Sequence, residues 1–371
     1  MKKRLLITTE NLNMGGVETS LITLLNKIDY KKWEVDLVTL DKGLLDNEVP
    51  KDVNHKILDI NYKGIIPRIL KSIKTKSLIK KYKNDKEYDI AIAYYGLNNY
   101  SDMYAAASNA KKKYVWVHND FKSALESSKY PALIKLRNKF MKSKFTYFDK
   151  IVSVSENCKI NFESLFGFKE KSISIYNLLN GEKYIENSKI KTDIKMDDKC
   201  FNICSIGRLV KSKQVDKLLS TIKELKDKNL KVKAYIIGDG PEKENLEKYV
   251  EENNLNDNVI FTGVLTNPYN ILKQADLFVS LSKHESLGLV LLEALILDIP
   301  VLSYNNDGAK DICENIAPKD KCVLVDNDNT LYILEKIITK KIKFSNEKFD
   351  YKKYNDLIKE SYKKELELDL E

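Results

Sequence analysis

The stretch that decides the fold is residues 201–241, which read FNICSIGRLVKSKQVDKLLSTIKELKDKNLKVKAYIIGDGP. Two short apolar runs, Phe201–Ile206 and Val232–Ile237, flank a segment in which apolar residues recur at helical spacing. Strands buried inside a parallel sheet read as near-continuous apolar runs, and a helix commonly connects two of them. The stretch therefore predicts a strand–helix–strand unit with parallel strands.

The same alternation extends from this stretch in both directions. Further apolar runs predict strands at Leu5–Thr8, Glu34–Leu40, Asp89–Tyr94, Tyr114–His118, Lys150–Val154, Ser172–Tyr176, Val259–Phe261, Leu277–Leu281, Pro300–Tyr304 and Cys322–Val325. Helical patterns lie between the strands, at Val17–Lys27, Lys213–Lys228, Glu242–Asn253 and Leu289–Leu297. Strands that alternate with helices indicate the α/β class, here as two doubly wound, Rossmann-like domains.

The two series of strands set the expected domain boundaries. The first series predicts an N-terminal domain over residues 1–180, and the second a C-terminal domain over residues 200–345. The polar residues 181–199 are predicted to form the hinge between them. Residues 346–371 are predicted to form a C-terminal helix that crosses back to the first domain. Two domains agree with a length of 371 residues, since a domain has about 100–200 residues.

Composition narrows the class of protein. With 43% hydrophobic and 32% charged residues, the chain is expected to be globular rather than disordered. No apolar run approaches the length of a membrane-spanning helix, and the N-terminus does not resemble a signal peptide. The five cysteines are an odd number without a Cys-x-x-Cys pair, which argues against a disulfide framework or a structural zinc. These features predict a cytoplasmic protein.

Charge is unevenly distributed, which predicts a negatively charged partner for the first half of the chain. Residues 1–180 carry a net charge of +12, whereas the whole chain carries +9 because the remaining residues are net negative. Segments 65–83 and 129–150 combine lysines with aliphatic residues at helical spacing. Basic amphipathic helices favour anionic membrane surfaces, although a solvated helix face explains each segment equally well. No signature of a nucleic-acid-binding module accompanies them.

Ligands of open α/β sheets bind where the strands end, and basic and glycine residues follow two of the predicted strands. Arg208 and Lys213 follow the strand Phe201–Ile206 and supply the charges that a diphosphate requires. Gly15 and Gly16 precede a predicted helix N-terminus, where backbone amides can approach a phosphate. The alternatives are a solvated basic turn at the first place and a plain strand–helix turn at the second.

Carboxylates mark a second part of the same site. The helix Leu289–Leu297 is apolar on every face except for Glu293. A buried carboxylate needs partners, and the hydroxyl groups of a ligand would supply them. The alternative is a backbone donor or a lysine in the same domain. Glu285 precedes this helix, in the loop after the strand Leu277–Leu281.

Two further residue types allow both a functional and a structural interpretation. His118 ends a predicted strand and is one of only three histidines, yet a single histidine is more often structural. Asp326-Asn327-Asp328 has the D-x-D pattern that metal-dependent sugar transferases use, although it also suits the cap of a following helix. We favour the cap, and therefore expect no metal site.

Taken together, these residues resemble the glycosyltransferase family 4 group of the GT-B fold. The resemblance is strongest over 201–314 and weaker over 1–180. The matching motifs are Gly15-Gly16-Val17-Glu18, Gly207-Arg208-Leu209 with Lys213, Gly238-Asp239-Gly240-Pro241, Phe261-Thr262-Gly263, Ser282-x-x-Glu285-x7-Glu293-Ala294 and Ile299-Pro300-Val301. Three departures leave the donor open: Gln214 replaces a glycine, Ser286-Leu287 replaces Gly-Phe, and Asn306-Asp307-Gly308 replaces a glycine-rich turn.

The resemblance implies a role for each matching position. Arg208 and Lys213 would bind the donor diphosphate, Glu293 the ribose hydroxyls, and Glu285 the transferred sugar. The remaining contacts would come from the backbone of Leu287, Gly288 and Leu289 to the phosphate and sugar, Val264 to the nucleobase, Gly15 and Gly16 to the diphosphate, and His118 to the sugar. The family needs no metal or other cofactor.

The resemblance thus predicts a bacterial retaining hexosyltransferase of EC class 2.4. Its donor would be a nucleoside diphosphate sugar, with a UDP-sugar favoured. Its acceptor would be a lipid-linked or surface glycan of capsule, lipopolysaccharide or exopolysaccharide biosynthesis, reached from the inner face of the cell membrane. The alternatives are a GT-B-fold nucleotide-sugar 2-epimerase, which would need more acid/base groups than three histidines suggest, and a catalytically silent GT-B partner subunit.

Overall fold

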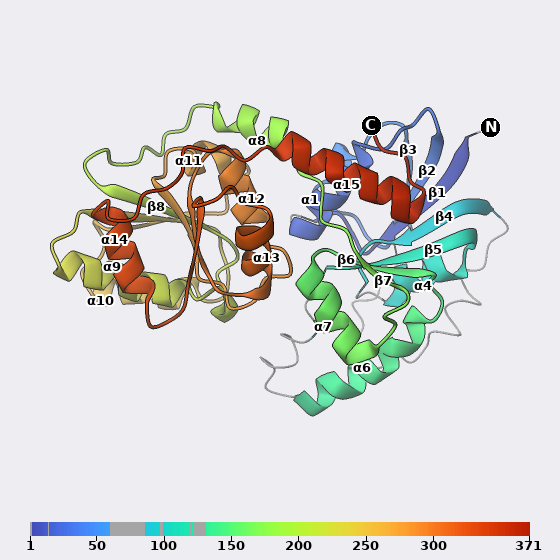
Figure 1. The fold of residues 1–371 in the computed structure, drawn as a ribbon, viewed down its shortest axis with the longest axis horizontal. Helices are drawn as coiled ribbons and strands as arrows, with labels where there is room; N and C mark the ends of the chain where they lie inside the picture. Colours follow the sequence, from blue (N-terminus) through green and yellow to red (C-terminus); the bar gives the residue numbers. More distant parts are fainter. Residues whose placement is uncertain (1, 14, 60–85, 97–98, 119–120, 122–130) are drawn as a thin grey trace. The chain divides into compact units, whose positions relative to one another are not determined.

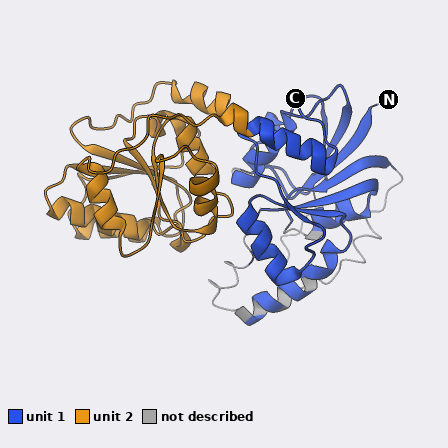
Figure 2. Cartoon of the chain, in the orientation of Figure 1, with its two compact units in different colours: residues 1–179, 355–371 blue, residues 180–354 orange. Residues whose placement is uncertain are grey.

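The computed structural model describes residues 2–13, 15–59, 86–96, 99–118, 121 and 131–371. The chain divides into two compact units (Figure 2). Unit 1 consists of residues 1–179 and 355–371, and unit 2 of residues 180–354. The chain therefore leaves the first unit once, completes the second, and returns to the first with its C-terminal segment.

Unit 1 is built on a seven-stranded parallel sheet in the order β3-β2-β1-β4-β5-β6-β7 (Figure 1). Its strands are β1 (Lys3–Thr9), β2 (Trp33–Thr39), β3 (Val53–Ile57), β4 (Glu87–Ala93), β5 (Asn109–Val117), β6 (Lys150–Ser153) and β7 (Ser172–Ser174). Its described helices are α1 (Gly16–Leu25), α4 (Asn99–Ala107), α6 (Pro131–Phe145), α7 (Glu156–Phe166) and α15 (Tyr351–Leu366), which begins in unit 2. The apolar centre of β1 is fully buried, as expected for a strand covered on both faces.

Unit 2 is built on a six-stranded parallel sheet in the order β10-β9-β8-β11-β12-β13. Its strands are β8 (Phe201–Ile206), β9 (Val232–Ile237), β10 (Val259–Gly263), β11 (Leu277–Ser280), β12 (Val301–Tyr304) and β13 (Cys322–Val325). Its helices are α8 (Gly181–Ser188), α9 (Val215–Asp227), α10 (Lys243–Glu252), α11 (Tyr269–Leu272), α12 (Leu289–Ile296), α13 (Asp307–Asn315) and α14 (Thr330–Ile338).

Each sheet has a point at which the strand order reverses. In unit 1 the chain reverses between β1 and β4, and in unit 2 between β8 and β11. The loops that leave two such neighbouring strands run in opposite directions over the sheet, and the crevice between them is the usual binding site of this fold class. The topology therefore directs attention to the loops after β1, β4, β8 and β11.

The predicted α/β fold with two doubly wound sheets is confirmed. All twelve predicted strands are present, and the sequence missed only β3 among the described strands. In that strand, Val53 is buried, while Asn54 and Lys56 are exposed. Among the described strands β3 pairs only with β2, at the edge of the sheet, and it lacks the continuous apolar run of the central strands.

The C-terminal segment is integrated into unit 1. Tyr362 of α15 is 1% exposed and stacks on Trp116 of β5, with ring centroids 5.8 Å apart. The Lys150 ammonium donates to the backbone carbonyl and the carboxylate of Glu365, at 2.6 and 2.9 Å. Aromatic stacking and partly buried ionic contacts thus fix the end of the chain to the sheet. Residues 181–199, predicted as the hinge, contain helix α8.

The structure bears on two expectations from the sequence, one about disulfides and one about membrane-spanning helices. Cys313 of α13 and Cys322 of β13 form a disulfide, so the expectation of no disulfide was wrong. The short connection from α13 to β13 brings their Cα atoms to 5.3 Å from each other, a distance that the odd number of cysteines could not reveal. No helix in the described part of the chain combines the length and the apolar character needed to cross a membrane.

Candidate functional site

The loop after β8 carries the two predicted cations of unit 2. Arg208 is exposed directly after the strand, and Lys213 ends a short 3-10 helix, Lys211–Lys213. The adjacent loop after β9 supports this segment, because the Leu209 amide donates to the Asp239 carbonyl at 2.9 Å. Both basic side chains therefore lie at the switch point of the second sheet, where the fold places its ligands.

The Gly238-Asp239-Gly240-Pro241 turn holds this loop by close backbone packing. A Cβ atom on Gly240 would lie 2.3 Å from the Leu209 carbonyl oxygen, and one on Gly238 would lie 2.0 Å from that of Gly207. Gly238 also has a φ of 142°, which side-chain-bearing residues rarely adopt. The glycines of this motif are thus explained by their support of the loop that carries Arg208.

The loop after β11 brings Glu285 to the same place. The Lys213 ammonium lies 2.5 Å from a carboxylate oxygen of Glu285, and the two side chains are 30% and 17% exposed. The backbones of the two loops are also joined, because the Lys283 amide donates to the Ser212 carbonyl at 2.8 Å. The structure therefore unites two residues that are 72 positions apart in the sequence.

Gln214 fills the position at which the resembling family has glycine. It adopts a left-handed conformation, with a φ of 50°, between the 3-10 helix and α9. With its amide oriented to suit both neighbours, it donates to the Leu281 carbonyl at 2.9 Å and accepts from the Lys217 ammonium at 2.8 Å. Gln214 thus adopts a strained backbone conformation, and its side chain forms a second connection between the loops after β8 and β11.

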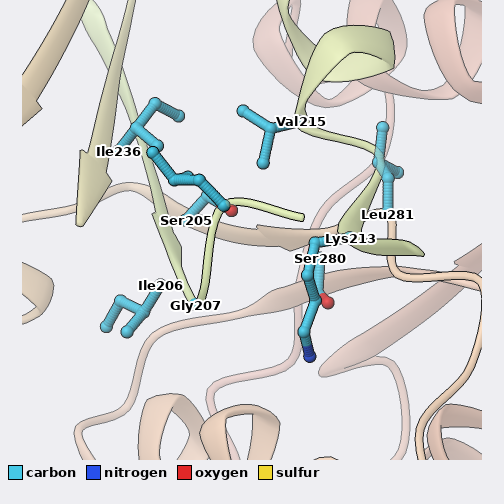
Figure 3. A pocket seen from close by; sticks show the side chains of 9 residues that line it. Ser205, Ile206, Gly207, Lys213, Val215, Ile236, Ser280 and Leu281 are labelled. Atoms are coloured by element: carbon cyan, nitrogen blue, oxygen red, sulfur yellow. The ribbon is translucent and has the colours of Figure 1, made fainter. Parts of the chain in front are cut away.

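A small pocket lies where these loops meet the ends of β8, β9 and β11 (Figure 3). Lys213 lines it on one side, and Ser280 at the end of β11 lines it as well. Ser205, Gly207 and Ile236, at or next to the ends of β8 and β9, also line it. Aliphatic side chains, two serines and the Lys213 cation thus line a hollow at the carboxyl edge of the sheet.

Helix α13 fixes the loop that carries Glu285. Asn306 caps this helix by accepting from the Ala309 amide at 2.9 Å, and its own amide donates to the Ser282 carbonyl at 2.8 Å. The Gly308 amide donates to the Glu285 carbonyl at 3.1 Å, and a Cβ atom on Gly308 would lie 2.6 Å from that oxygen. Asn306-Asp307-Gly308 therefore begins a helix instead of forming only a turn.

The residues predicted to hold the phosphate, Leu287, Gly288 and Leu289, lie at the start of helix α12. Leu287 is buried, and Gly288 is the N-cap in a left-handed conformation, with a φ of 82°. The helix begins at Leu289. The first amides of a helix lack partners within the helix, so their positive ends favour a phosphate.

Glu293 of α12 is half-buried and adjoins two tyrosines. Burial raises the pKa of its carboxyl group to about 7, and a hydrogen bond with the Tyr269 side chain opposes this rise. Tyr269 of α11 stacks on Tyr184 of α8, with ring centroids 4.8 Å apart. Burial raises the pKa of Tyr184, and the negative charge of Glu293 raises it further. A tyrosine is therefore a hydrogen-bond partner of Glu293.

The predicted residues of unit 1 lie at the corresponding edge of the first sheet. Gly15 is the N-cap of α1, which begins at Gly16, and a Cβ atom on Gly15 would lie 2.5 Å from a carboxylate oxygen of Glu18. His118 directly follows β5 and is 8% exposed. The two glycines thus form the strand–helix turn expected from the sequence.

His118 is held as a neutral ring. Its imidazole is hydrogen-bonded to the backbone of Tyr94, whose own ring is 4.8 Å away. The Nε2 atom is buried without a hydrogen-bond partner among the described residues. Burial lowers the pKa of His118 to about 3, so one ring nitrogen remains a free acceptor at neutral pH.

The remaining sequence predictions are placed as follows. Val264 follows β10 and is 65% exposed. Asp326-Asn327-Asp328 lies in the turn before α14, whose N-cap is Asn329; the Asn329 side chain accepts from the Asp326 amide at 2.9 Å, and no side chain caps this helix. The predicted cap by this triplet is thus wrong, and the described residues contain no cluster suited to a metal ion.

Sequence reasoning missed Tyr184 and Tyr269 and the bridging role of Gln214. The tyrosines lie on α8 and α11, far from Glu293 in sequence, and no spacing rule connects them. The available signal was the carboxylate itself, because a half-buried Glu293 in an apolar helix requires a donor nearby. The replacement of the family's glycine by Gln214 was the corresponding signal for the bridge.

Two family models match the chain and together cover most of it. The model for glycosyl transferases group 1 matches residues 186–364. The model for glycosyltransferase family 4 matches residues 14–182. The boundary between the two matches falls close to residue 180, at which the chain enters unit 2.

Individual relatives agree with these models. An uncharacterized glycosyltransferase of Methanocaldococcus jannaschii is 29% identical over 301 residues, which are 79% of this chain and 71% of the relative. The N-acetylgalactosamine-N,N'-diacetylbacillosaminyl-diphospho-undecaprenol 4-alpha-N-acetylgalactosaminyltransferase of Campylobacter jejuni is 27% identical over 335 residues, covering 87% of this chain and 86% of the relative. Anabaena HepE, solved with UDP and glucose, superposes with a TM-score of 0.71 at 17% identity, over 98% of this chain and 100% of HepE.

Proposed function

This chain is a glycosyltransferase of the GT-B fold and belongs to glycosyltransferase family 4, and on that premise we propose that it transfers a hexose with retention of configuration. The donor is a nucleoside diphosphate sugar, and a UDP-sugar is favoured. The observation that carries the proposal is the pairing of Lys213 with Glu285 beside the exposed Arg208, at the switch point of the second sheet. A cation for the phosphate and a carboxylate for sugar hydroxyls are the groups that such a donor requires.

The proposed chemistry follows from charge. Departure of the diphosphate leaves negative charge on the phosphate oxygens, and Arg208 and Lys213 stabilise that charge without a metal ion. The amides at the start of α12 add positive dipoles at the same edge of the sheet. The phosphate oxygen assists deprotonation of the attacking hydroxyl, so that attack on the donor face retains its configuration.

Four other groups are proposed to orient the donor. Glu293 accepts hydrogen bonds from the ribose hydroxyls, and Val264 contacts the nucleobase. From unit 1, the free Nε2 atom of His118 accepts a hydrogen bond from a sugar hydroxyl. The Gly15–Gly16 turn lets the backbone approach the diphosphate. Each of these assignments extends the family resemblance to a residue whose environment is now known.

The donor is identified by a thermal-shift screen of UDP-, GDP- and ADP-linked hexoses. The proposal expects the melting temperature to rise most with a UDP-sugar, such as UDP-glucose, UDP-galactose or a UDP-N-acetylhexosamine. GDP- and ADP-linked hexoses should raise it less. If no nucleotide sugar at millimolar concentration stabilises the protein, the proposed donor class is wrong.

Glu293 predicts an unusual pH dependence. The pKa of its carboxyl group is raised from 4.5 to about 7 in the folded protein. The stability that comes from protonated Glu293 is therefore present below pH 4.5 and is lost as the pH rises through about 7. Glu293→Gln removes this cost, so the ligand-free variant should unfold at a higher temperature than wild type at pH 8, and at a similar temperature at pH 4.5.

The same substitution should weaken nucleotide binding at pH 8, where wild-type Glu293 is ionised. The loss of charged hydrogen bonds is expected to cost about 1.5–3 kcal/mol of binding free energy. Calorimetric melting at both pH values and UDP titration at pH 8 test the two effects, with the exposed Glu314→Gln as control. A variant that binds UDP as tightly as wild type would assign Glu293 a purely structural role.

We also propose that the acceptor is a lipid-linked or surface glycan, and that the enzyme acts at the cytoplasmic face of the cell membrane. The name of the Campylobacter relative describes a substrate linked through diphosphate to undecaprenol. Segment 65–83 lies outside the described residues. In the segment 129–150, the exposed Lys135, Lys139 and Lys142 of α6 are spaced for one helix face. An anionic lipid surface would contact this face.

Replacement of Lys135, Lys139 and Lys142 with glutamine should weaken sedimentation with anionic vesicles by at least about tenfold, since each lysine near such a surface contributes about 1 kcal/mol. The matched control replaces the exposed Lys248, Lys310 and Lys319 of unit 2, with the same loss of charge. Both proteins should bind UDP like wild type. Equal sedimentation of wild type with neutral and anionic vesicles would contradict membrane binding through this face.

A further inference from the structure

The contact between Lys213 and Glu285 places opposite charges at the proposed phosphate and sugar subsites. The Lys213 ammonium and a carboxylate oxygen of Glu285 lie 2.5 Å apart. The Glu285 carboxylate therefore neutralises the charge of Lys213. A ligand that uses the Lys213 ammonium must either share it with Glu285 or displace that carboxylate.

The pairing is built into the loops that carry both residues. The Lys283 amide donates to the Ser212 carbonyl, and the Gln214 side chain donates to the Leu281 carbonyl, so the backbones beside the pair are connected twice. On the other side, the Gly308 amide holds the Glu285 carbonyl. These hydrogen bonds fix both loops and therefore keep the Glu285 carboxylate next to the Lys213 ammonium.

We propose that Glu285 makes tight binding of the diphosphate conditional on an attached sugar. A sugar-bearing donor offers hydroxyl groups that replace Lys213 as partners of the Glu285 carboxylate, which frees the ammonium for the phosphate. A free nucleoside diphosphate brings negative charge and no such hydroxyl group, so the carboxylate competes with it for Lys213 and repels it. Glu285 is thus a specificity-determining residue that favours the intact donor over the nucleotide product.

This inference rests on the proposed function. Substitution of an ordinary binding residue weakens ligand binding, whereas substitution of Glu285 should strengthen the binding of a free diphosphate. Glu285→Gln keeps the shape of the side chain but removes its charge, so Lys213 becomes available to any phosphate. The variant should bind UDP and inorganic pyrophosphate about three- to tenfold more tightly than wild type, as expected for removal of one partly exposed charge pair. Its affinity for the stabilising UDP-sugar should not rise, because the charged acceptor of the sugar hydroxyls is lost.

The experiment is calorimetric titration of UDP, pyrophosphate and the UDP-sugar that stabilises the protein most in the thermal-shift screen. Four proteins are compared: wild type, Glu285→Gln, Lys213→Met, and the double variant. The gain in UDP affinity should disappear in the Lys213→Met background, since no ammonium remains to be released. Glu314→Gln removes an exposed carboxylate elsewhere in unit 2 and controls for the change in net charge.

The outcomes separate the inference from its premise. Unchanged or weaker binding of UDP by Glu285→Gln, with wild type binding normally, would overturn the conditional role of Glu285 and leave the donor site in place. A gain that persists without Lys213 would overturn it as well, because the effect would not pass through the pair. Failure of wild type to bind any nucleoside diphosphate or its sugar would overturn the proposed function itself.

Discussion

Arg208→Ala is expected to lower kcat/KM for sugar transfer about 100- to 1,000-fold, the usual effect of removing one group that stabilises charge in a transition state. Arg208 is exposed directly after β8, and the loop that carries it is fixed by the Gly238–Pro241 turn. Its guanidinium can donate two parallel hydrogen bonds to phosphate oxygens, which a lysine cannot reproduce. The loss should appear mainly in kcat, because the charge on the diphosphate grows as the sugar leaves.

The matched control is Lys211→Ala, which removes an exposed cation from the same loop. It should keep kcat/KM within about threefold of wild type, as expected for a screened surface charge. Initial rates of nucleotide release give kcat and kcat/KM for both variants. The rates are measured with saturating acceptor, or as donor hydrolysis without acceptor. Equal rates for Arg208→Ala and Lys211→Ala would show that Arg208 does not contact the reacting diphosphate.

Lys144→Met is expected to destabilise unit 1 by about 3–5 kcal/mol, because it leaves the carboxylate of Asp102 buried and unpaired. The Lys144 ammonium lies 2.5 Å from an Asp102 oxygen, and the two side chains are only 1% and 0% exposed. Lys144 also donates to the Gly96 carbonyl at 2.7 Å. This pair therefore connects helices α4 and α6 to the segment after β4, at the switch point of the first sheet.

The measurement is urea unfolding followed by tryptophan fluorescence. Both tryptophans of the chain, Trp33 and Trp116, are buried in unit 1, so the signal reports that unit alone. The control is Lys144→Met combined with Asp102→Leu, which removes both charges and should recover most of the lost stability. If the double variant were no more stable than Lys144→Met, the cost would come from packing and not from the unpaired charge.

Much of the fold could be predicted from the sequence, because strands buried on both faces require continuous apolar runs. Strands β8 and β9 show this most clearly, and both were predicted with the observed bounds. Prediction failed for a strand at the edge of a sheet and for a helix whose start depends on a single capping residue. Strand β3 alternates exposed and buried residues at the sheet edge, and α13 begins at an Asn-Asp-Gly sequence that is equally typical of a turn.

The candidate site was predictable only in part, since local sequence identifies the chemistry of a residue but not its partners. Arg208, Lys213 and Glu285 each stand just after a strand, which suffices to place them at one edge of the sheet. The Lys213–Glu285 contact required the tertiary structure, because it joins loops after β8 and β11. The contact of Tyr269 with Glu293 likewise depends on how α11 packs in unit 2.

The most direct test of the account is proton NMR of the stabilising UDP-sugar incubated with the protein in the absence of acceptor. The account predicts slow release of UDP and of a free hexose that first appears in the anomeric configuration of the donor. Arg208→Ala combined with Lys213→Ala should abolish this release. A UDP-sugar that stays intact with wild type, or one converted to its 2-epimer, would contradict the assignment of this chain as a retaining hexosyltransferase.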